Sequence, residues 1–318
     1  MQMLTDLFYI VLYVSVIGSI FTAVLLFISR ILQCALPLWF PLGGMILYAF
    51  PFLSPDVFLI PRETQMWAEG FRAASVIWVC GCILFLIRDW IRLVLAGQAV
   101  KNCRICRDRR LAEISIRCAG MAGLKRKPLL YWGSLDDPVC VTGILRPVIL
   151  LKEEITAQLS DAELTAVLSH EMTHVRRKHI LLERIWAYIC ILNWFNPLVW
   201  AAAKEFSLHC EMDCDDKTLR NLRGKITKAE YAYAMIRLLE LSAVRRVKHR
   251  QGTGALSFFL TKRRVRRMTA ESSKRKKRMT AVLLVVVLAF VIIFSMRFSR
   301  QHFYPYPAYN VGIETGVQ

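Results

Sequence analysis

The chain has 318 residues, of which 55% are hydrophobic, and it carries a formal net charge of +19. That combination excludes an ordinary soluble domain, in which apolar and charged residues are mixed along the chain. Here they separate, because 36 of the 43 lysines and arginines lie between residues 97 and 280, and apolar runs flank that segment on both sides.

Four apolar runs are predicted to cross a membrane as helices. Three open the chain, at residues 7–29, 35–53 and 73–87, and the fourth follows at 281–296. The first is long enough to cross about 30 Å of hydrocarbon. It also exceeds a signal-peptide core and has no convincing small-residue cleavage site, so we expect it to be retained. The second holds three prolines and is expected to be kinked or tilted.

The distribution of basic residues predicts the orientation. Arginine and lysine are enriched in cytoplasmic loops beside membrane spans. The 54–71 loop has only Arg62 and the C-terminal tail only Arg297 and Arg300. We therefore expect a multi-pass protein of the cell membrane with residues 97–280 in the cytoplasm and both termini outside. The basic charge is expected to meet the anionic leaflet of the lipid bilayer, with no direct binding of nucleic acid.

Seven of the ten cysteines lie in the segment 97–280, which fits a reducing cytoplasm. Cys103 and Cys106 form a C-x-x-C pair, but no second pair completes a zinc ribbon. Reduced thiols beside the membrane are the preferred interpretation, and a metal or redox site is the alternative.

A β-rich stretch, residues 139–151, is punctuated by Gly143 and Pro147. Proline is confined to edge strands or strand starts, so this stretch is predicted to be an edge strand. An exposed edge can hold an extended peptide by adding it as a further strand. An ordinary structural strand is the alternative.

The sequence His170-Glu171-Met172-Thr173-His174 carries the clearest chemical signal. Ser160 and Glu163 form a capping box that opens a helix predicted to run to about Tyr188. Residues four apart share a helix face, so His170 and His174 can place two nitrogens on one Zn²⁺ at about 2.0–2.1 Å. Glu171 can act on a water at the metal without being a ligand. A chance occurrence of the motif is the weaker explanation.

A catalytic zinc needs a third protein ligand and an open position. Residues 205–219 are predicted to form another helix, on which Glu211 and Asp215 lie four apart. We predict Glu211 as the third ligand and Asp215 as a partner that orients a ligand histidine. A solvated acidic helix face is the alternative. His179 and His209 are weaker ligand candidates; on a continuous helix, His179 lies about 140° round from His174.

The intervening stretch, residues 185–203, is long and apolar enough to suggest a fifth span. A single crossing would place Glu211 about 30 Å from the two histidines it must join. We therefore predict a turn-containing hairpin that is partly embedded in the membrane or lies at its interface, with Trp186, Trp194 and Trp200 near the headgroups.

These motifs resemble those of the peptidase M56 family, the membrane metallopeptidases that include β-lactam-sensing regulators. The resemblance covers residues 1 to about 297 and rests on four stretches, at 145–151, 170–174, 193–200 and 211–216. It implies a gluzincin-like α+β domain, zinc held by His170, His174 and Glu211, and Glu171 as the base. It also implies signalling, in which an outside cue activates the peptidase, which cleaves itself and inactivates a cytoplasmic transcriptional repressor.

The chain differs from the family pattern in two respects. It has histidine at 179 and 209, where family members often have an acidic residue. Antibiotic-sensing members also carry a penicillin-binding domain after the last span, whereas residues 297–318 are too few to fold as a domain. We therefore expect no such sensor here.

The predicted fold class is a polytopic α-helical membrane protein with a cytoplasmic α+β zinc metallopeptidase domain. Three spans occupy residues 1–96, the peptidase domain 97–243, a basic linker 244–280, the fourth span 281–297 and an extracytoplasmic tail 298–318. A zinc-containing receptor without activity and a housekeeping membrane protease are the alternative functions, and homodimerisation is left open.

The basic linker is the predicted region of self-cleavage. Residues 251–254 disfavour a helix, and the apolar patch that follows suits extended binding beside an edge strand. We predict cleavage between Ser257 and Phe258, with the Arg263–Arg264 region as the second candidate. A helix that packs on the peptidase domain is the alternative.

Overall fold

The computed structural model describes residues 2–32, 68–133 and 138–248, together with residues 264, 282, 285, 286 and 289. In this part of the chain, two helices are long and apolar enough to cross a membrane. They are α1 (Gln2–Leu32) and α3 (Ala68–Lys101), which contain the first and third predicted spans. The second predicted span, and all but four residues of the fourth, lie outside the described residues, so the four-span topology stays a prediction.

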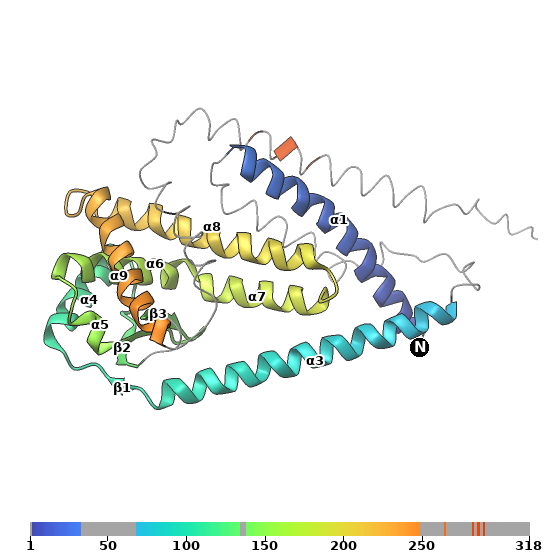
Figure 1. Ribbon diagram of the computed structural model, residues 1–318, viewed down its shortest axis with the longest axis horizontal. Helices are drawn as coiled ribbons and strands as arrows, with labels where there is room; N and C mark the ends of the chain where they lie inside the picture. The colour runs from blue at the N-terminus through green and yellow to red at the C-terminus, as the bar shows by residue number, and fades with distance from the viewer. Residues whose placement is uncertain are drawn as a thin grey trace, which may run out of the picture.

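A four-stranded sheet lies at one end of the molecule (Figure 1). The strand order is β1 (Arg104–Ile105), β2 (Leu129–Trp132), β4 (Val148–Leu151), β3 (Val139–Thr142). β2 and β4 run parallel, and the other two pairs are antiparallel. Helices α4 (Arg109–Met121), α5 (Glu153–Thr156), α6 (Asp161–Arg177) and α9 (Lys228–Lys248) surround it. The predicted α+β content is thus confirmed.

The prediction of one edge strand over residues 139–151 is wrong. The stretch is a hairpin, and β4 lies inside the sheet between β2 and β3. Gly143 turns the chain at φ 88°, where a Cβ would lie 2.6 Å from the carbonyl oxygen of Arg146. Pro147 precedes β4, where its missing N–H removes no ladder bond. The outer strand at this side of the described sheet is β3.

One hydrophobic core joins the sheet to α4, α6 and α9. Burying a large apolar side chain contributes about 1.5–3 kcal/mol, so this core fixes α6 firmly against the sheet. Its fully buried members come from all of these elements: Leu111, Ile114, Ile149, Leu151, Leu168 and Tyr231.

The helix predicted from Ser160 to about Tyr188 is broken, so that prediction is wrong. α6 ends at Arg177, Lys178 adopts the left-handed conformation with φ 55° and ψ 35°, and α7 (His179–Leu192) follows directly. A non-glycine residue in this conformation costs roughly 1–2 kcal/mol. No glycine or asparagine marks the break, so local sequence signals do not reveal it.

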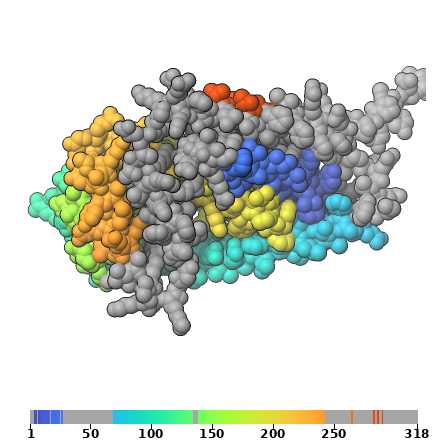
Figure 2. All heavy atoms as spheres, turned by 45° about the horizontal axis from the view of Figure 1, so that its top comes forward, coloured from blue at the N-terminus to red at the C-terminus, as the bar shows by residue number. Residues whose placement is uncertain are grey.

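Helices α7 and α8 (Pro197–Asn221) form the predicted turn-containing hairpin. Its turn packs between α1 and α3: Trp78 Nε1 donates to the Leu192 carbonyl at 2.8 Å, and Asn196 Nδ2 donates to Ser15 Oγ at 2.6 Å. α1 and the α7–α8 hairpin adjoin at the molecular surface (Figure 2). Because α8 returns along α7, it brings Glu211 back to α6. The depth of the hairpin in a membrane stays a prediction.

Candidate metal centre

Two histidines on α6 define the centre. The capping box forms as predicted, since the Glu163 backbone N–H donates to Ser160 Oγ and the Ser160 backbone N–H donates to Glu163 Oε2. It fixes the start of the helix, ten residues before His170. The Nε2 atoms of His170 and His174 lie 3.1 Å apart, so both rings point to one place. His170 is 2% exposed and His174 partly exposed, which leaves the centre accessible from the side of His174.

Glu211 on α8 completes the group. Its Oε2 lies 3.3 Å from His170 Nε2, and its Oε1 lies 3.3 Å from His174 Nε2. The three residues offer two imidazole nitrogens and a carboxylate oxygen within 4.8 Å of one another. This donor set and spacing fit a cation such as zinc, which takes three protein ligands in its catalytic sites.

Asp215 and Tyr231 contact Nδ1 of the His170 ring, whereas His174 and Glu211 lie at its Nε2. His170 Nδ1 lies 2.9 Å from the Tyr231 hydroxyl oxygen and 3.2 Å from Asp215 Oδ1, and the Tyr231 hydroxyl donates to Asp215 Oδ1 at 2.9 Å. With the hydroxyl proton given to Asp215, His170 keeps its hydrogen on Nδ1, and Nε2 supplies the ligand lone pair once a binding cation displaces its proton. Asp215 thus lies where the sequence predicted it, beside a candidate ligand. Tyr231 was not predicted, because it lies 61 residues beyond His170 and carries no motif.

Arg264 reaches the same centre from the basic linker. Its guanidinium donates two hydrogen bonds to Asp215, at 2.8 and 2.9 Å, and Nη1 lies 2.8 Å from Glu211 Oε2. The two carboxylates therefore face the guanidinium, whose positive charge lies beside the position that a metal cation bound to Glu211 would take. Arg264 belongs to the second predicted cleavage region, but no sequence pattern indicated this contact.

These contacts shift the pKa values of the buried groups. Burial would raise the pKa of Asp215 and Glu211, but the Arg264 guanidinium and the histidines outweigh it and hold both well below their ordinary values. For His170, burial is opposed by hydrogen bonds to Asp215 and Glu211, which raise its pKa to about 9. Burial and the neighbouring Asp215 raise the pKa of Tyr231. Both carboxylates are therefore charged at neutral pH, and His170, which is protonated there in the absence of a metal, must release its Nε2 proton when a cation binds.

The remaining predicted residues lie as follows. Glu171 is half-buried on α6, directly after His170. His209 is buried on α8, with Nε2 3.6 Å from Glu205 Oε1, and belongs to neither of the two metal-type groups found among the described residues. His179 lies against His174 on the side away from Glu211. Ser257 and Phe258 lie outside the described residues.

Comparison with known proteins places the chain in a family. The model of the family described as BlaR1 peptidase M56 matches residues 59–268, a range that contains every residue of the centre. The regulatory protein BlaR1 of Bacillus licheniformis is 29% identical over 154 residues, which are 48% of this chain and 26% of that protein. The methicillin resistance mecR1 protein of Staphylococcus aureus (strain Mu50 / ATCC 700699) is 20% identical over 151 residues, 46% of this chain and 25% of that protein. The match thus spans about a quarter of each relative. The chain belongs to the M56 peptidase family.

Proposed function

We propose that the chain is a membrane-anchored zinc metallopeptidase that hydrolyses peptide bonds on the cytoplasmic side. The observation that carries this proposal is the convergence of His170 Nε2, His174 Nε2 and the Glu211 carboxylate, 3.1–3.3 Å apart. A catalytic zinc site has this ligand set and keeps a further position open. Membership of a peptidase family and two helices able to span a membrane support the same function.

The reaction assigns one task to each residue. Bound zinc supplies Lewis acidity, which lowers the pKa of water and polarises the scissile carbonyl. The Glu171 carboxylate takes a proton from the attacking water and passes it to the leaving nitrogen. Tyr231 and Asp215 keep the His170 ring in the tautomer that presents Nε2.

The substrate is expected to bind in an extended form along β3. This strand pairs with β4 on one side only within the described sheet, and it packs beside α6, which carries the two histidines. Backbone groups on an unpaired strand edge bind an extended peptide by strand addition. Helix α6 also contacts α8, which carries Glu211, so a peptide along β3 would lie close to the helix that bears the two histidines.

Replacing Glu171 with glutamine tests the enzyme function against a receptor that holds zinc without activity. Cleavage should fall by roughly 10²–10⁴-fold because the proton acceptor is lost, while zinc content stays the same. Replacing His174 or Glu211 with alanine should remove both zinc and activity. Glu113→Gln, at an exposed position on α4, is the matched control and should change neither. Undiminished cleavage by the Glu171→Gln protein would refute the mechanism.

The printed names of the relatives, a regulatory protein and a methicillin resistance protein, favour a role in signalling. We propose that the peptidase cleaves its own linker and inactivates a transcriptional repressor. The contact of Arg264 with Glu211 and Asp215 supports this, because it tethers the linker at the centre. Ser257 lies seven residues earlier, and seven extended residues span at most about 25 Å. A tether of that length allows the Ser257–Phe258 bond to approach the centre, as the proposed cleavage requires.

Mass spectrometry of the chain ends tests self-cleavage. Membranes that contain the active protein should yield a new terminus after Ser257, or else at Arg263–Arg264, and the Glu171→Gln protein should yield neither. Absence of any Glu171-dependent terminus between residues 245 and 278 under inducing conditions would contradict self-cleavage and leave the peptidase proposal standing.

A further inference from the structure

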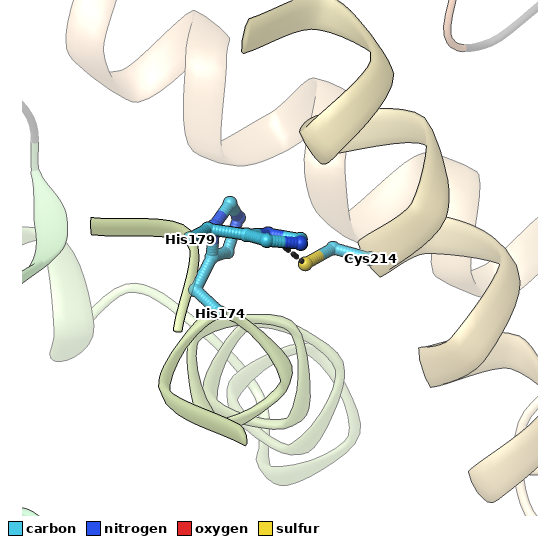
Figure 3. A group of neighbouring side chains, drawn as sticks. All are labelled: His174, His179 and Cys214. Carbon is cyan, nitrogen blue, oxygen red and sulfur yellow. Dashed lines mark hydrogen bonds between the residues drawn. The ribbon is translucent and has the colours of Figure 1, made fainter. Parts of the chain in front are cut away.

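Three side chains from three helices meet on the far side of the His174 ring. His174 comes from α6, His179 from the first turn of α7 and Cys214 from α8, and their side chains converge (Figure 3). His179 Nδ1 lies 3.3 Å from His174 Nδ1 and 3.3 Å from Cys214 Sγ. All three potential ligand atoms lie within 4.8 Å of one another. His174 takes part through its Nδ1, whereas its Nε2 is the atom that faces His170 and Glu211.

Hydrogen bonding alone does not satisfy this cluster. When His174 presents Nε2 to Glu211, its hydrogen is on Nδ1 and points at His179 Nδ1. Cys214 Sγ lies 3.3 Å from the same nitrogen, and where the thiol donates to it, two hydrogens compete for one lone pair. His179 is 1% exposed, Cys214 is 0% exposed, and His179 Nε2 has no hydrogen-bond partner among the described residues. Nε2 faces no partner there, so Nδ1 is the ring atom through which His179 meets its two neighbours.

The backbone conformation of Lys178 places His179 beside His174. On a continuous helix, a residue five positions after His174 would lie about 140° away from it. The left-handed conformation of Lys178, φ 55°, ends α6 and turns the His179 ring back against that of His174, with ring centroids 5.2 Å apart. Strained backbone conformations of this kind gather at functional sites.

The spacing matches a metal site. Ligand atoms about 2.0–2.3 Å from one tetrahedral cation lie roughly 3.3–3.7 Å from each other, as His179 does from its two neighbours. A thiolate with two imidazoles selects thiophilic cations such as Zn²⁺ or Cu⁺ over magnesium or calcium. A cation at this position would take the place of both competing hydrogens.

We propose that His174, His179 and Cys214 form a second metal site that binds one thiophilic cation. Binding forms bonds to the two Nδ1 atoms and to Sγ, and it releases the thiol proton of Cys214 and the Nδ1 proton of His174 to solvent. His174 then belongs to both sites, with Nε2 facing Glu211 and Nδ1 facing Cys214. Occupancy of either site must therefore alter the metal affinity of the other, and by the same factor in both directions.

Cobalt(II) titration of the full-length, metal-free protein in detergent tests the proposal. The site at Glu211 contains no sulfur, so a thiolate-to-cobalt charge-transfer band reports the second site alone. We expect two equivalents of Co²⁺ to bind and the band to appear. Cys214→Ser should abolish the band and lower the stoichiometry by one, and His179→Asn should do the same if the serine variant does not fold. His170→Ala should keep the band, at a changed cobalt affinity, because it removes a ligand of the other site and none of this one.

Two cysteine controls make the assignment specific. Cys210→Ser, at a buried thiol one turn earlier on α8, should keep the band. A double Cys103→Ser, Cys106→Ser variant should keep it as well, which excludes the C-x-x-C pair as its source. A single bound equivalent without a thiolate band in the wild type would overturn the proposal. So would a band that survives in Cys214→Ser and disappears in the double variant.

Discussion

Tyr231 is the residue on which the support of the His170 ring depends. It is 0% exposed, its hydroxyl lies 2.9 Å from His170 Nδ1, and it donates to Asp215. Partners that hold a ligand histidine in this way fix the orientation and tautomer of its ring and thereby affect the metal affinity. The tyrosine therefore acts on the metal through the histidine rather than by contact.

Replacing Tyr231 with phenylalanine is expected to weaken zinc binding by about 10–100-fold. The ring still fills the core, so the fold is kept, but His170 loses one partner and Asp215 a donor. Competition with a chromophoric chelator measures the change. Tyr233→Phe is the matched control, because Tyr233 lies on the same helix and is 58% exposed. Equal affinities of the two variants would contradict the assignment.

The sequence predicted the four residues that lie on two helices at spacings of four, namely His170, His174, Glu211 and Asp215. A local pattern is sufficient for these, because helical periodicity fixes which side chains share a face. Tyr231 and Arg264 could not be found this way. They contact Asp215 from positions 16 and 49 residues further along the chain, and only tertiary packing brings such distant positions together. The chemical roles of all six remain predictions until they are measured.

Arg264 is expected to compete with zinc for Glu211. Its Nη1 lies 2.8 Å from Glu211 Oε2, so the guanidinium must withdraw from that oxygen for the carboxylate to bind a cation. Arg264→Gln should bind zinc about tenfold more tightly, which corresponds to about 1.4 kcal/mol. The same chelator competition measures it, with the exposed Arg223→Gln as control. Weaker zinc binding by Arg264→Gln would show that the arginine supports the centre through Asp215 instead.

Among the elements, the α7–α8 hairpin was predicted correctly and the α6–α7 break was not. Asn196 and Pro197 are strong signals for a helix start, and the side chain of Asn196 does cap α8 by accepting from the Leu198 N–H. Lys178 gives no such signal, because its left-handed conformation is imposed by tertiary packing against local preference. The β3–β4 hairpin was predicted only in part. Gly143 marked its turn, but strand order in a sheet is set by long-range pairing that no local pattern encodes.

Close packing of α3 against the hairpin turn requires a glycine at position 81. A Cβ there would lie 2.3 Å from the Trp194 indole, whose Nε1 donates to the Trp78 carbonyl. Gly81→Ala should therefore lower stability by about 1–3 kcal/mol, since the indole must move. Thermal unfolding in detergent measures this. Gly97→Ala on the same helix meets nothing within 4 Å and should leave stability unchanged or raise it. Equal melting temperatures of the two variants would refute this packing.

At the scale of the whole molecule, the metal centre is built onto the candidate membrane helices. The α7–α8 hairpin contacts α1 and α3 (Figure 1), and Glu211 lies in the second half of α8, away from the hairpin turn. Arg184 on α7 also pairs with Asp89 on α3, with Nη1 2.9 Å from Oδ1. These contacts connect α1 and α3 to the helix that carries a candidate ligand, and we propose them as the route by which an outside signal reaches the centre.

That route requires the centre and the outside cue to be on opposite sides of the membrane, which a topology experiment decides. Basic residues surround the peptidase domain, and cytoplasmic loops are enriched in them, so we expect this domain to be inside. A reporter that is active only outside the membrane should be active when fused after Pro61 or after Gln318. After Gly224, in the exposed turn that follows α8, it should be silent, and a cytoplasmic reporter should give the reverse pattern. Reporter activity outside the membrane at Gly224 would place the metal centre on the side opposite a cytoplasmic repressor and would refute repressor cleavage. The peptidase chemistry would then be tested by the Glu171 variant alone.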